Sequence, residues 1–399
     1  MSDNNIHKAY DNIQDFSEIA PYSDAQVGEK MAELVKEPGF EHAVRYVMPD
    51  VDYPAFAEKL KSVSSLDDFQ IKVMGPFLEL LVSTTTKGLS YDGLENIDPA
   101  KGYTFITNHR DIVLDASFLN LCFIREHLPL SEVAIGNNLL IYDWITDLVK
   151  LNRSFIVKRD VKVAQALDAA RQLSAYIHYT VCGRNQSVWI AQREGRAKDS
   201  NDVTQESLVK MMSLAGDGDT KHNLLEINLL PVAISYEFDP NDYLKVREFV
   251  LRRRDPEFKK SQRDDLFSME TGILRQKGRV HFHFGRCINA RLEKTDDTLS
   301  RNAVLHNVCG LIDNAIHCGY YMYPCNYIAF DEINGTARFA DRYTEVDVMA
   351  FDDYIKAQLE KVEVDDITPE EHVYMREMML SMYANPLKNQ LVAKDSENF

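Results

Sequence analysis

The chain has 399 residues, of which 45% are hydrophobic and 27% charged, with 17 glycines and 13 prolines. This composition permits a sizeable buried core and excludes fibrous and low-complexity proteins. The 62 acidic and 45 basic side chains give a formal net charge of -17, which argues against nucleic acid as the main partner.

The six cysteines contain no C-x-x-C pair, so the sequence indicates neither a disulfide framework nor a zinc site, and we expect reduced thiols in a cytoplasmic protein. The first thirty residues lack the basic and apolar regions of a signal peptide. No stretch reaches the roughly 18 uninterrupted apolar residues that a membrane span needs. Any contact with a membrane is therefore predicted to be peripheral.

Residues 1–84 are predicted to form an N-terminal helical region. Helical spacing covers 24–36 and 40–47, and Pro38-Gly39 separates the two segments. The apolar positions of 66–81 also have helical spacing, which favours packing on the core, with a lipid surface as the alternative.

From residue 85 onward, short apolar runs alternate with helical patterns. The expected strands are 89–97, 104–108, 132–140, 155–159, 187–191, 230–237 and 279–285, and the expected helices between them include 116–128, 142–151 and 163–179. This alternation predicts an α/β fold with a mixed, largely parallel sheet flanked by helices. We expect a catalytic domain over 85–295 and a mostly helical C-terminal extension over 296–399, whose last helix ends near Pro386.

His109 follows one of these strands, and two carboxylates, Asp111 and Asp115, come within the next two helical turns. This pattern suits a general base whose imidazole is oriented by an acid. The alternative is a structural histidine with a capping aspartate at an ordinary strand-to-helix turn.

Four sequence blocks, which follow one another in a set order along the chain, favour the general base over the structural histidine. They are Asn108-His109 with Asp111 or Asp115; Phe155-Ile156-Val157-Lys158-Arg159 after Gly136-Asn137-Asn138-Leu139; Glu194-Gly195-Arg196-Ala197-Lys198; and Leu230-Pro231-Val232-Ala233-Ile234-Ser235-Tyr236-Glu237. Over roughly residues 85–290 this set resembles the glycerolipid acyltransferase superfamily, and within it the glycerol-3-phosphate and dihydroxyacetone-phosphate acyltransferase branch.

The resemblance implies that His109 is the base and that the acyl group moves directly to the acceptor. The chain has no G-x-S-x-G nucleophile turn, which agrees with direct transfer. A phosphate on the acceptor calls for fixed cations, which Arg159, with Arg196 and Lys198, would provide. We expect Glu194 to hold these cations in place and Gly195 to be among the substrate-binding residues. The alternatives are that the cations are solvated surface charges and that Glu194 forms only a local surface salt bridge.

Two spacings differ from the family pattern. The family's histidine and aspartate are five positions apart, whereas Asp115 is six and Asp111 two positions from His109. We expect Asp115 to partner His109, because helical side chains lean toward the N-terminus, and Asp111 to cap the helix. The third block has its arginine two positions after Glu194 rather than three, so Arg196 and Lys198 are rival counterparts of the family's arginine.

The sequence therefore predicts a cytoplasmic acyltransferase that contacts an anionic membrane peripherally. It would move a fatty acyl group from CoA or acyl carrier protein to a hydroxyl of a glycerol-phosphate-like acceptor, with no metal and no cofactor. The alternatives are an enzyme of the same superfamily acting on lysophosphatidate or a lipidated amino acid, and a catalytically silent protein that binds lipid or acyl carrier protein.

Two further features have less specific readings. His281 and His283 alternate on one strand, but no third ligand stands at a suggestive spacing, so a metal is not favoured. A basic island lies in 245–263. It is most simply a solvated helical face, with docking to anionic lipid or acyl carrier protein as the alternatives.

Overall fold

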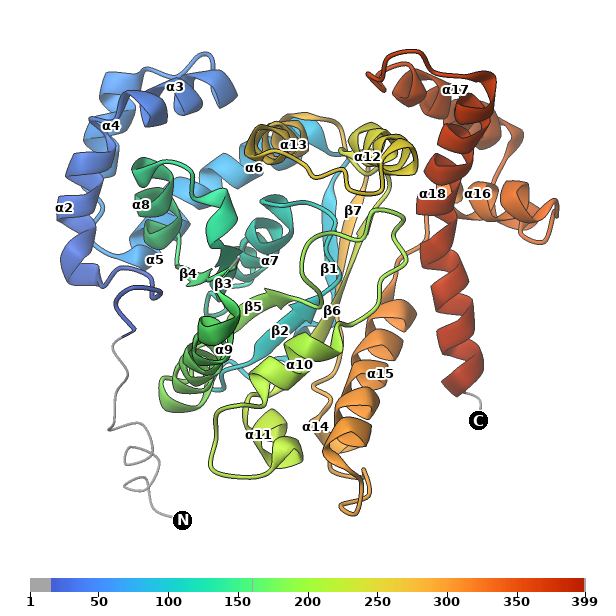
Figure 1. Cartoon of the computed structure of the whole chain (residues 1–399). Helices are drawn as coiled ribbons and strands as arrows, with labels where there is room; N and C mark the ends of the chain where they lie inside the picture. The colour runs from blue at the N-terminus through green and yellow to red at the C-terminus, as the bar shows by residue number, and fades with distance from the viewer. Residues whose placement is uncertain (1–15, 160, 398–399) are drawn as a thin grey trace.

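The structure, a computed structural model, describes residues 16–159 and 161–397. The part of the predicted N-terminal helical region that falls on 1–15 lies outside these residues. Within them the chain forms a central sheet with helices on both faces and a helical group at either side (Figure 1).

The central sheet has seven strands within the described ranges. They are β1 (Leu89–Asp92), β2 (Thr104–Thr107), β3 (Glu132–Gly136), β4 (Ser154–Val157), β5 (Val188–Ala191), β6 (Leu229–Tyr236) and β7 (Val280–Phe284). Their order is β1-β7-β6-β2-β5-β3-β4, and every neighbouring pair is parallel except β6 and β7. The predicted α/β fold with a mixed, largely parallel sheet is confirmed.

The described helices come in two groups along the chain. Before β5 they are α2 (Asp24–Leu34), α3 (Pro38–Val47), α4 (Tyr53–Lys61), α5 (Leu66–Phe69), α6 (Gly75–Thr85), α7 (Leu114–Arg125), α8 (Asp143–Leu151) and α9 (Val163–His178). After β5 they are α10 (Glu206–Met212), α11 (Thr220–Glu226), α12 (Asp242–Arg254), α13 (Gln262–Leu274), α14 (Asn289–Leu292), α15 (Arg301–Gly319), α16 (Pro324–Asn334), α17 (Glu345–Leu359) and α18 (Pro369–Glu397).

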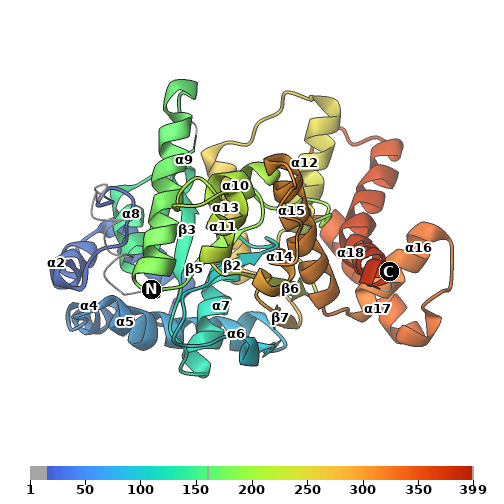
Figure 2. The ribbon, with the colours of Figure 1, turned by 90° about the horizontal axis from the view of Figure 1, so that it is seen from below.

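The central strands are buried on both faces, as expected where helices cover a parallel sheet on either side. All eight residues of β6 and all four of β2 are buried. On β2, Phe105 packs toward α6 and α7, whereas Ile106 packs toward α9, α10 and α15. Figure 2 shows the sheet between these two helical layers. Helix α15, which the sequence places in the C-terminal extension, is therefore part of the core of the sheet.

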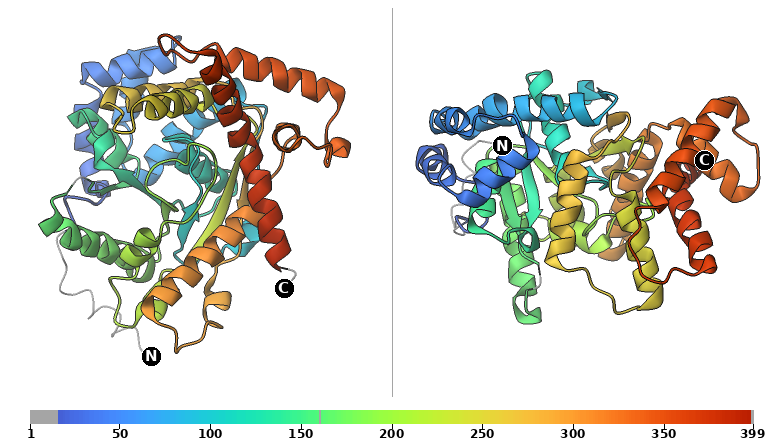
Figure 3. Two further views of the ribbon diagram at one scale, coloured as in Figure 1. Left: turned by 45° about the vertical axis from the view of Figure 1, so that its right-hand side comes forward. Right: turned by 90° about the horizontal axis from the view of Figure 1, so that it is seen from above.

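The predicted end of the C-terminal helix near Pro386 is wrong, because α18 continues through Pro386 to Glu397. Beyond this proline, Leu387 and Gln390 are buried, and the Gln390 amide donates to the Tyr320 carbonyl at 2.7 Å. Figure 3 shows α18 running beside α15. Packing on a neighbouring helix keeps the chain helical although a proline removes one backbone hydrogen bond.

No helix in the described part of the chain combines the length and the apolar character that crossing a bilayer requires.

Candidate active site

Asn108 fixes the point at which the chain leaves the sheet. The backbone of β2 ends its pairing at Thr107, and the buried Asn108 side chain then bonds Ile234 of β6 in both directions. Its Nδ2 donates to the Ile234 carbonyl at 2.9 Å, and its Oδ1 accepts from the Ile234 N–H at 2.8 Å. The amide thus takes the place of one more residue of strand and holds His109 at the carboxyl end of β2.

His109 is held by Asp115, the first acidic residue inside α7. One oxygen of this carboxylate, Oδ2, lies 2.8 Å from His109 Nδ1 and also accepts the backbone N–H groups of Arg110 at 2.6 Å and Asp111 at 3.0 Å. Asp115 is fully buried, whereas 13% of the His109 side chain is exposed. The contact expected from the sequence is present. It places the proton on Nδ1 and leaves Nε2 as the nitrogen able to accept another.

Asp111 has the capping role that the sequence analysis favoured. Its Oδ1 accepts from the backbone N–H groups of Val113 at 2.9 Å and Leu114 at 2.8 Å, so it closes the first turn of α7. Burial, followed by the neighbouring Asp115 carboxylate, raises the pKa of Asp111.

Two aromatic side chains complete the surroundings of the pair. The Trp189 ring of β5 meets the His109 ring edge-on at a centroid distance of 5.7 Å. The buried Tyr236 hydroxyl lies beside Asp115, and burial, with Asp115 as the next cause, raises its pKa well above the usual range. Tyr236 belongs to the fourth sequence block, but the sequence assigned it no role, because its nearness to Asp115 depends on the pairing of β6 with β2.

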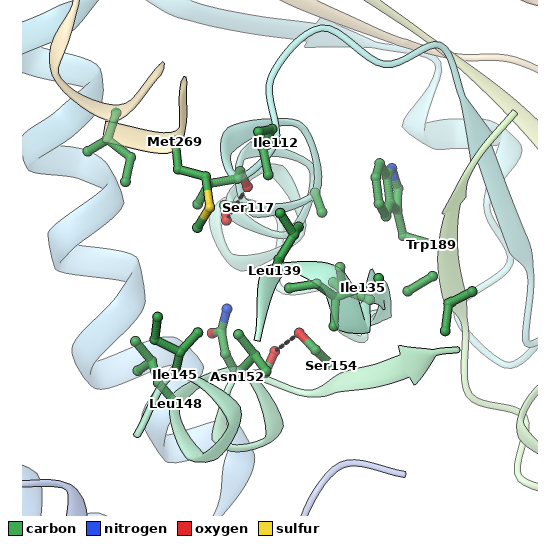
Figure 4. Close-up of a pocket in the computed structure, with 18 of the residues that line it drawn as sticks. Ile112, Ser117, Ile135, Leu139, Ile145, Leu148, Asn152, Ser154, Trp189 and Met269 are labelled. Atoms are coloured by element: carbon green, nitrogen blue, oxygen red, sulfur yellow. Dashed lines mark hydrogen bonds between the residues drawn. The ribbon is translucent and has the colours of Figure 1, made fainter. Parts of the chain in front are cut away.

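His109 and Trp189 line a cavity of about 1450 Å³. Helices α3, α6, α7, α8 and α13 surround it together with β3, β4 and β5, and most of the side chains facing it are apolar. Figure 4 shows Ile112, Ile135, Leu139, Leu148 and Met269 gathered around this space. A cavity of this size exceeds the roughly 300–1,000 Å³ of most small-molecule sites, so it fits a ligand with a long apolar part.

Cations that follow two of the strands line the same cavity. Arg159 follows β4 and Arg193 follows β5, with Glu194 and Gly195 beside them. The Nε of Arg159 lies 3.6 Å from Oε1 of Glu194. The sequence assigned no role to Arg193, which stands directly before the third block. The signal was available, because Arg193 is two residues beyond the end of a buried strand.

A direct contact joins the two halves of the second block, the turn at 136–139 and the segment that ends in Arg159. The Arg159 N–H donates to Oδ1 of Asn137 at 2.8 Å. A Cβ on Gly136 would lie 2.7 Å from Nε of Arg159, so glycine leaves room for the guanidinium. The turn after β3 therefore positions the arginine that follows β4.

Arg196 and Lys198 lie outside the lining of the cavity, next to α12, where Arg196 is buried and Lys198 half-buried. In the amide orientation that satisfies both of its ends, Asn241 accepts from Arg196 Nη1 at 3.3 Å. Lys198 Nζ lies 3.0 Å from Oε2 of Glu248. Burial, followed by Arg196, lowers the pKa of Lys198 to about 7. Direct binding of a substrate by these two cations stays a prediction that their placement does not favour.

The two alternating histidines lie on β7, next to β1. His283 Nδ1 contacts Asp92 Oδ1 at 2.5 Å, and His281 Nδ1 lies 2.9 Å from the Ser90 hydroxyl. Across residues 16–159 and 161–397, no cluster of three or more His, Cys, Asp or Glu side chains is arranged to hold a metal ion.

Much of the basic island pairs within the chain. Arg254 forms a two-pronged ion pair with Glu371 and also donates to the Asp365 carbonyl, while Arg253 lies 4.3 Å from the ring centre of Tyr374. These contacts fasten α12 to the start of α18. The predicted solvated helical face therefore describes only part of the basic island.

Comparison with protein-family models found no match. Comparison with curated protein sequences also found none. Among solved structures, the chain is similar to the 1-acyl-sn-glycerophosphate (LPA) acyltransferase PlsC from Thermotoga maritima, with a TM-score of 0.33 and 11% sequence identity. The similarity covers 71% of this chain and 94% of that one.

Proposed function

We propose that this chain is an O-acyltransferase that moves a fatty acyl group from a thioester to a hydroxyl of a glycerol-phosphate-like acceptor. One observation carries the proposal. A histidine oriented by a buried aspartate lines a large, mainly apolar cavity. Two partly exposed arginines that follow strand ends, Arg159 and Arg193, line the same cavity. The residues thus combine a base, room for an acyl chain and a place for a phosphate.

His109 would act as the base in this reaction. Its Nε2 takes the proton of the acceptor hydroxyl while that oxygen attacks the thioester carbonyl. The tetrahedral intermediate then collapses, the carbon–sulfur bond breaks, and the imidazolium returns the proton to the departing thiolate. The products are an ester and a free thiol. Asp115 stabilises the imidazolium between the two proton transfers and keeps the ring aimed at the acceptor.

The cations would select the acceptor. A phosphate is bound well by guanidinium groups, which donate two parallel charge-assisted hydrogen bonds. Arg159 is positioned by Gly136 and Asn137, and Glu194 is near enough to restrict its side chain. Arg193 lines the same cavity and provides the second positive charge.

A second acceptor class has a specific observation in its favour. The volume of about 1450 Å³ has room for an acceptor that already carries an acyl chain, such as lysophosphatidate or a lipidated amino acid. CoA or acyl carrier protein as the donor, and peripheral contact with an anionic membrane on the cytoplasmic side, belong to the same proposal.

The experiment is an acceptor screen with the purified full-length protein and one long-chain acyl thioester. Mass spectrometry follows ester formation from glycerol 3-phosphate, dihydroxyacetone phosphate, lysophosphatidate, a lipidated amino acid and glycerol. The proposal predicts an ester with a phosphorylated acceptor and little with glycerol. Thioester binding with no ester from any acceptor would identify a silent binding protein instead.

A further inference from the structure

The turn that carries His109 has a second anchor outside the cavity. Arg110, the residue after the histidine, has a side chain that is only 6% exposed. Its guanidinium forms two hydrogen bonds with the still more deeply buried Asp202, at 2.8 Å between Nη1 and Oδ1 and at 2.6 Å between Nη2 and Oδ2. This is the two-pronged geometry in which arginine and carboxylate bind most strongly and with the most defined orientation.

Helix α15 and the residue that follows it hold Asp202 in turn. The Tyr320 hydroxyl donates to Asp202 Oδ2 at 2.6 Å, and His317 Nε2 lies 2.8 Å from the Asp202 carbonyl. The Arg110 guanidinium also lies over the Tyr320 ring, 5.8 Å from its centre. The C-terminal part of the chain, in which the sequence indicated no catalytic residue, therefore reaches the residue next to His109.

The backbone of Arg110 connects this anchor to the histidine. The Arg110 N–H donates to Asp115 Oδ2, the same oxygen that lies against His109 Nδ1. A shift of Arg110 would move a donor that fixes the orienting carboxylate. Small displacements of catalytic groups lower turnover strongly, because reaction needs a defined approach of the reacting atoms.

We propose that Asp202, acting through Arg110, is a positioning residue for His109. The proposal rests on the proposed function for its kinetic effect. It gives Asp202 no contact with substrate, since neither Asp202 nor Arg110 lines the cavity.

The chain offers a matched control elsewhere in the sheet. Glu132, at the start of β3, accepts from Arg184 Nη2 at 2.8 Å and from the Tyr176 hydroxyl at 2.6 Å. Arg184 also lies over the Tyr176 ring, 5.9 Å from its centre. This arginine–carboxylate–tyrosine group has the composition of the Arg110–Asp202–Tyr320 group, but it lies at the opposite, amino end of the parallel strands, away from His109.

The experiment compares Asp202→Asn with Glu132→Gln. Each variant keeps the side-chain shape and removes one buried negative charge, so both should lose thermal stability. At a temperature where both are folded, Asp202→Asn should lower kcat about 10- to 100-fold with little change in either KM, while Glu132→Gln should stay within about threefold of the wild type. Equal kcat losses in the two variants, or wild-type kcat in folded Asp202→Asn, would overturn the proposal.

A milder pair covers the case in which Asp202→Asn does not fold. Tyr320→Phe removes one hydrogen bond to Asp202, and Tyr176→Phe removes its counterpart at Glu132. Only Tyr320→Phe should lower kcat, by about three- to tenfold, and equal activity of the two variants would count against the positioning role.

An NMR titration separates failure of this proposal from failure of the proposed function. The ¹⁵N signals of the His109 imidazole report its tautomer and its titration without any acyl transfer. Asp202→Asn or Tyr320→Phe should change them and Glu132→Gln should not. Unchanged His109 signals in all three variants would contradict the positioning role even if the wild type transfers acyl groups, whereas changed signals in an inactive protein would contradict only the proposed reaction.

Discussion

Gly272 of α13 lies so close to Asp111, in the turn that carries His109, that no larger residue fits at position 272. A Cβ on Gly272 would lie 1.9 Å from Oδ2 of Asp111. Gly272→Ala should therefore push α13 away from the turn and lower the free energy of unfolding by about 1–3 kcal/mol, the usual range for overpacking a core. Chemical denaturation measures this change.

Gly310 of α15 is the control for that substitution. It is also inside a helix, but a Cβ there would meet no atom within 4 Å. Gly310→Ala should raise the free energy of unfolding by about 0.4–1 kcal/mol, because alanine restricts the unfolded chain. Similar stabilities for the two variants would show that α13 adapts without cost.

The two carboxylates near His109 should respond differently to substitution. Asp111→Ala removes the side chain that accepts the Val113 and Leu114 N–H groups, and should lower stability by about 1 kcal/mol or more. Asp115→Asn keeps the shape but loses the charge that stabilises the imidazolium, so it should lower kcat much more than it changes KM. Thermal unfolding and steady-state kinetics of both variants test this division. Full turnover in Asp115→Asn would require another partner for His109.

Arg159 and Arg196 have the same expected role in the sequence but different places in the structure. Arg159→Ala should raise the acceptor's KM by about ten- to hundredfold and leave the donor's KM nearly unchanged, because one charge-assisted bond to phosphate is lost. Arg196→Ala should mainly lower thermal stability, since Arg196 is buried beside Asn241. A selective rise of the acceptor's KM in Arg196→Ala would instead return the phosphate to this residue.

Asp242 should make stability depend on pH. Burial raises its pKa from 3.8 to about 7, although the Tyr354 and Tyr383 hydroxyls both donate to its Oδ2. A carboxyl that holds its proton more tightly when folded costs nothing below its ordinary pKa. It lowers the free energy of unfolding as pH rises from that value toward the folded pKa, and the loss is complete above the folded pKa. The contribution of Asp242 to the free energy of unfolding should therefore fall between about pH 4 and pH 7.

Asp242→Asn removes the titrating group and retains an oxygen that can accept from both tyrosines. Its midpoint of thermal unfolding should gain a few degrees on the wild type as the pH is raised from 4.5 to 8. Midpoints of the two proteins that change in parallel over this range would show that Asp242 does not titrate there.

The sequence predicted the strands and the approximate place of the site because both follow from local patterns. Alternating apolar runs and helices predicted the sheet, and helical spacing favoured Asp115 as the partner of His109. It could not place Arg196, since the rule that ligands gather at strand ends names an edge and not the direction a loop takes after it. Arg193 enters the cavity and Arg196, three residues on, turns into the interior.

Other features depend on partners far away in the chain. Tyr320 reaches Asp202 across 118 positions, and Arg254 reaches Glu371 across 117. The continuation of α18 past Pro386 is of the same kind, because contacts such as that of Gln390 with Tyr320 offset the local preference of a proline. No spacing within one segment reports such contacts.

The most direct test of the central claim is the rate of ester formation by His109→Ala, measured by mass spectrometry under saturating thioester and acceptor. The variant should unfold at nearly the wild-type temperature and form the ester about two to four orders of magnitude more slowly, the usual loss for a general base. Turnover near the wild-type rate in well-folded His109→Ala would contradict the account.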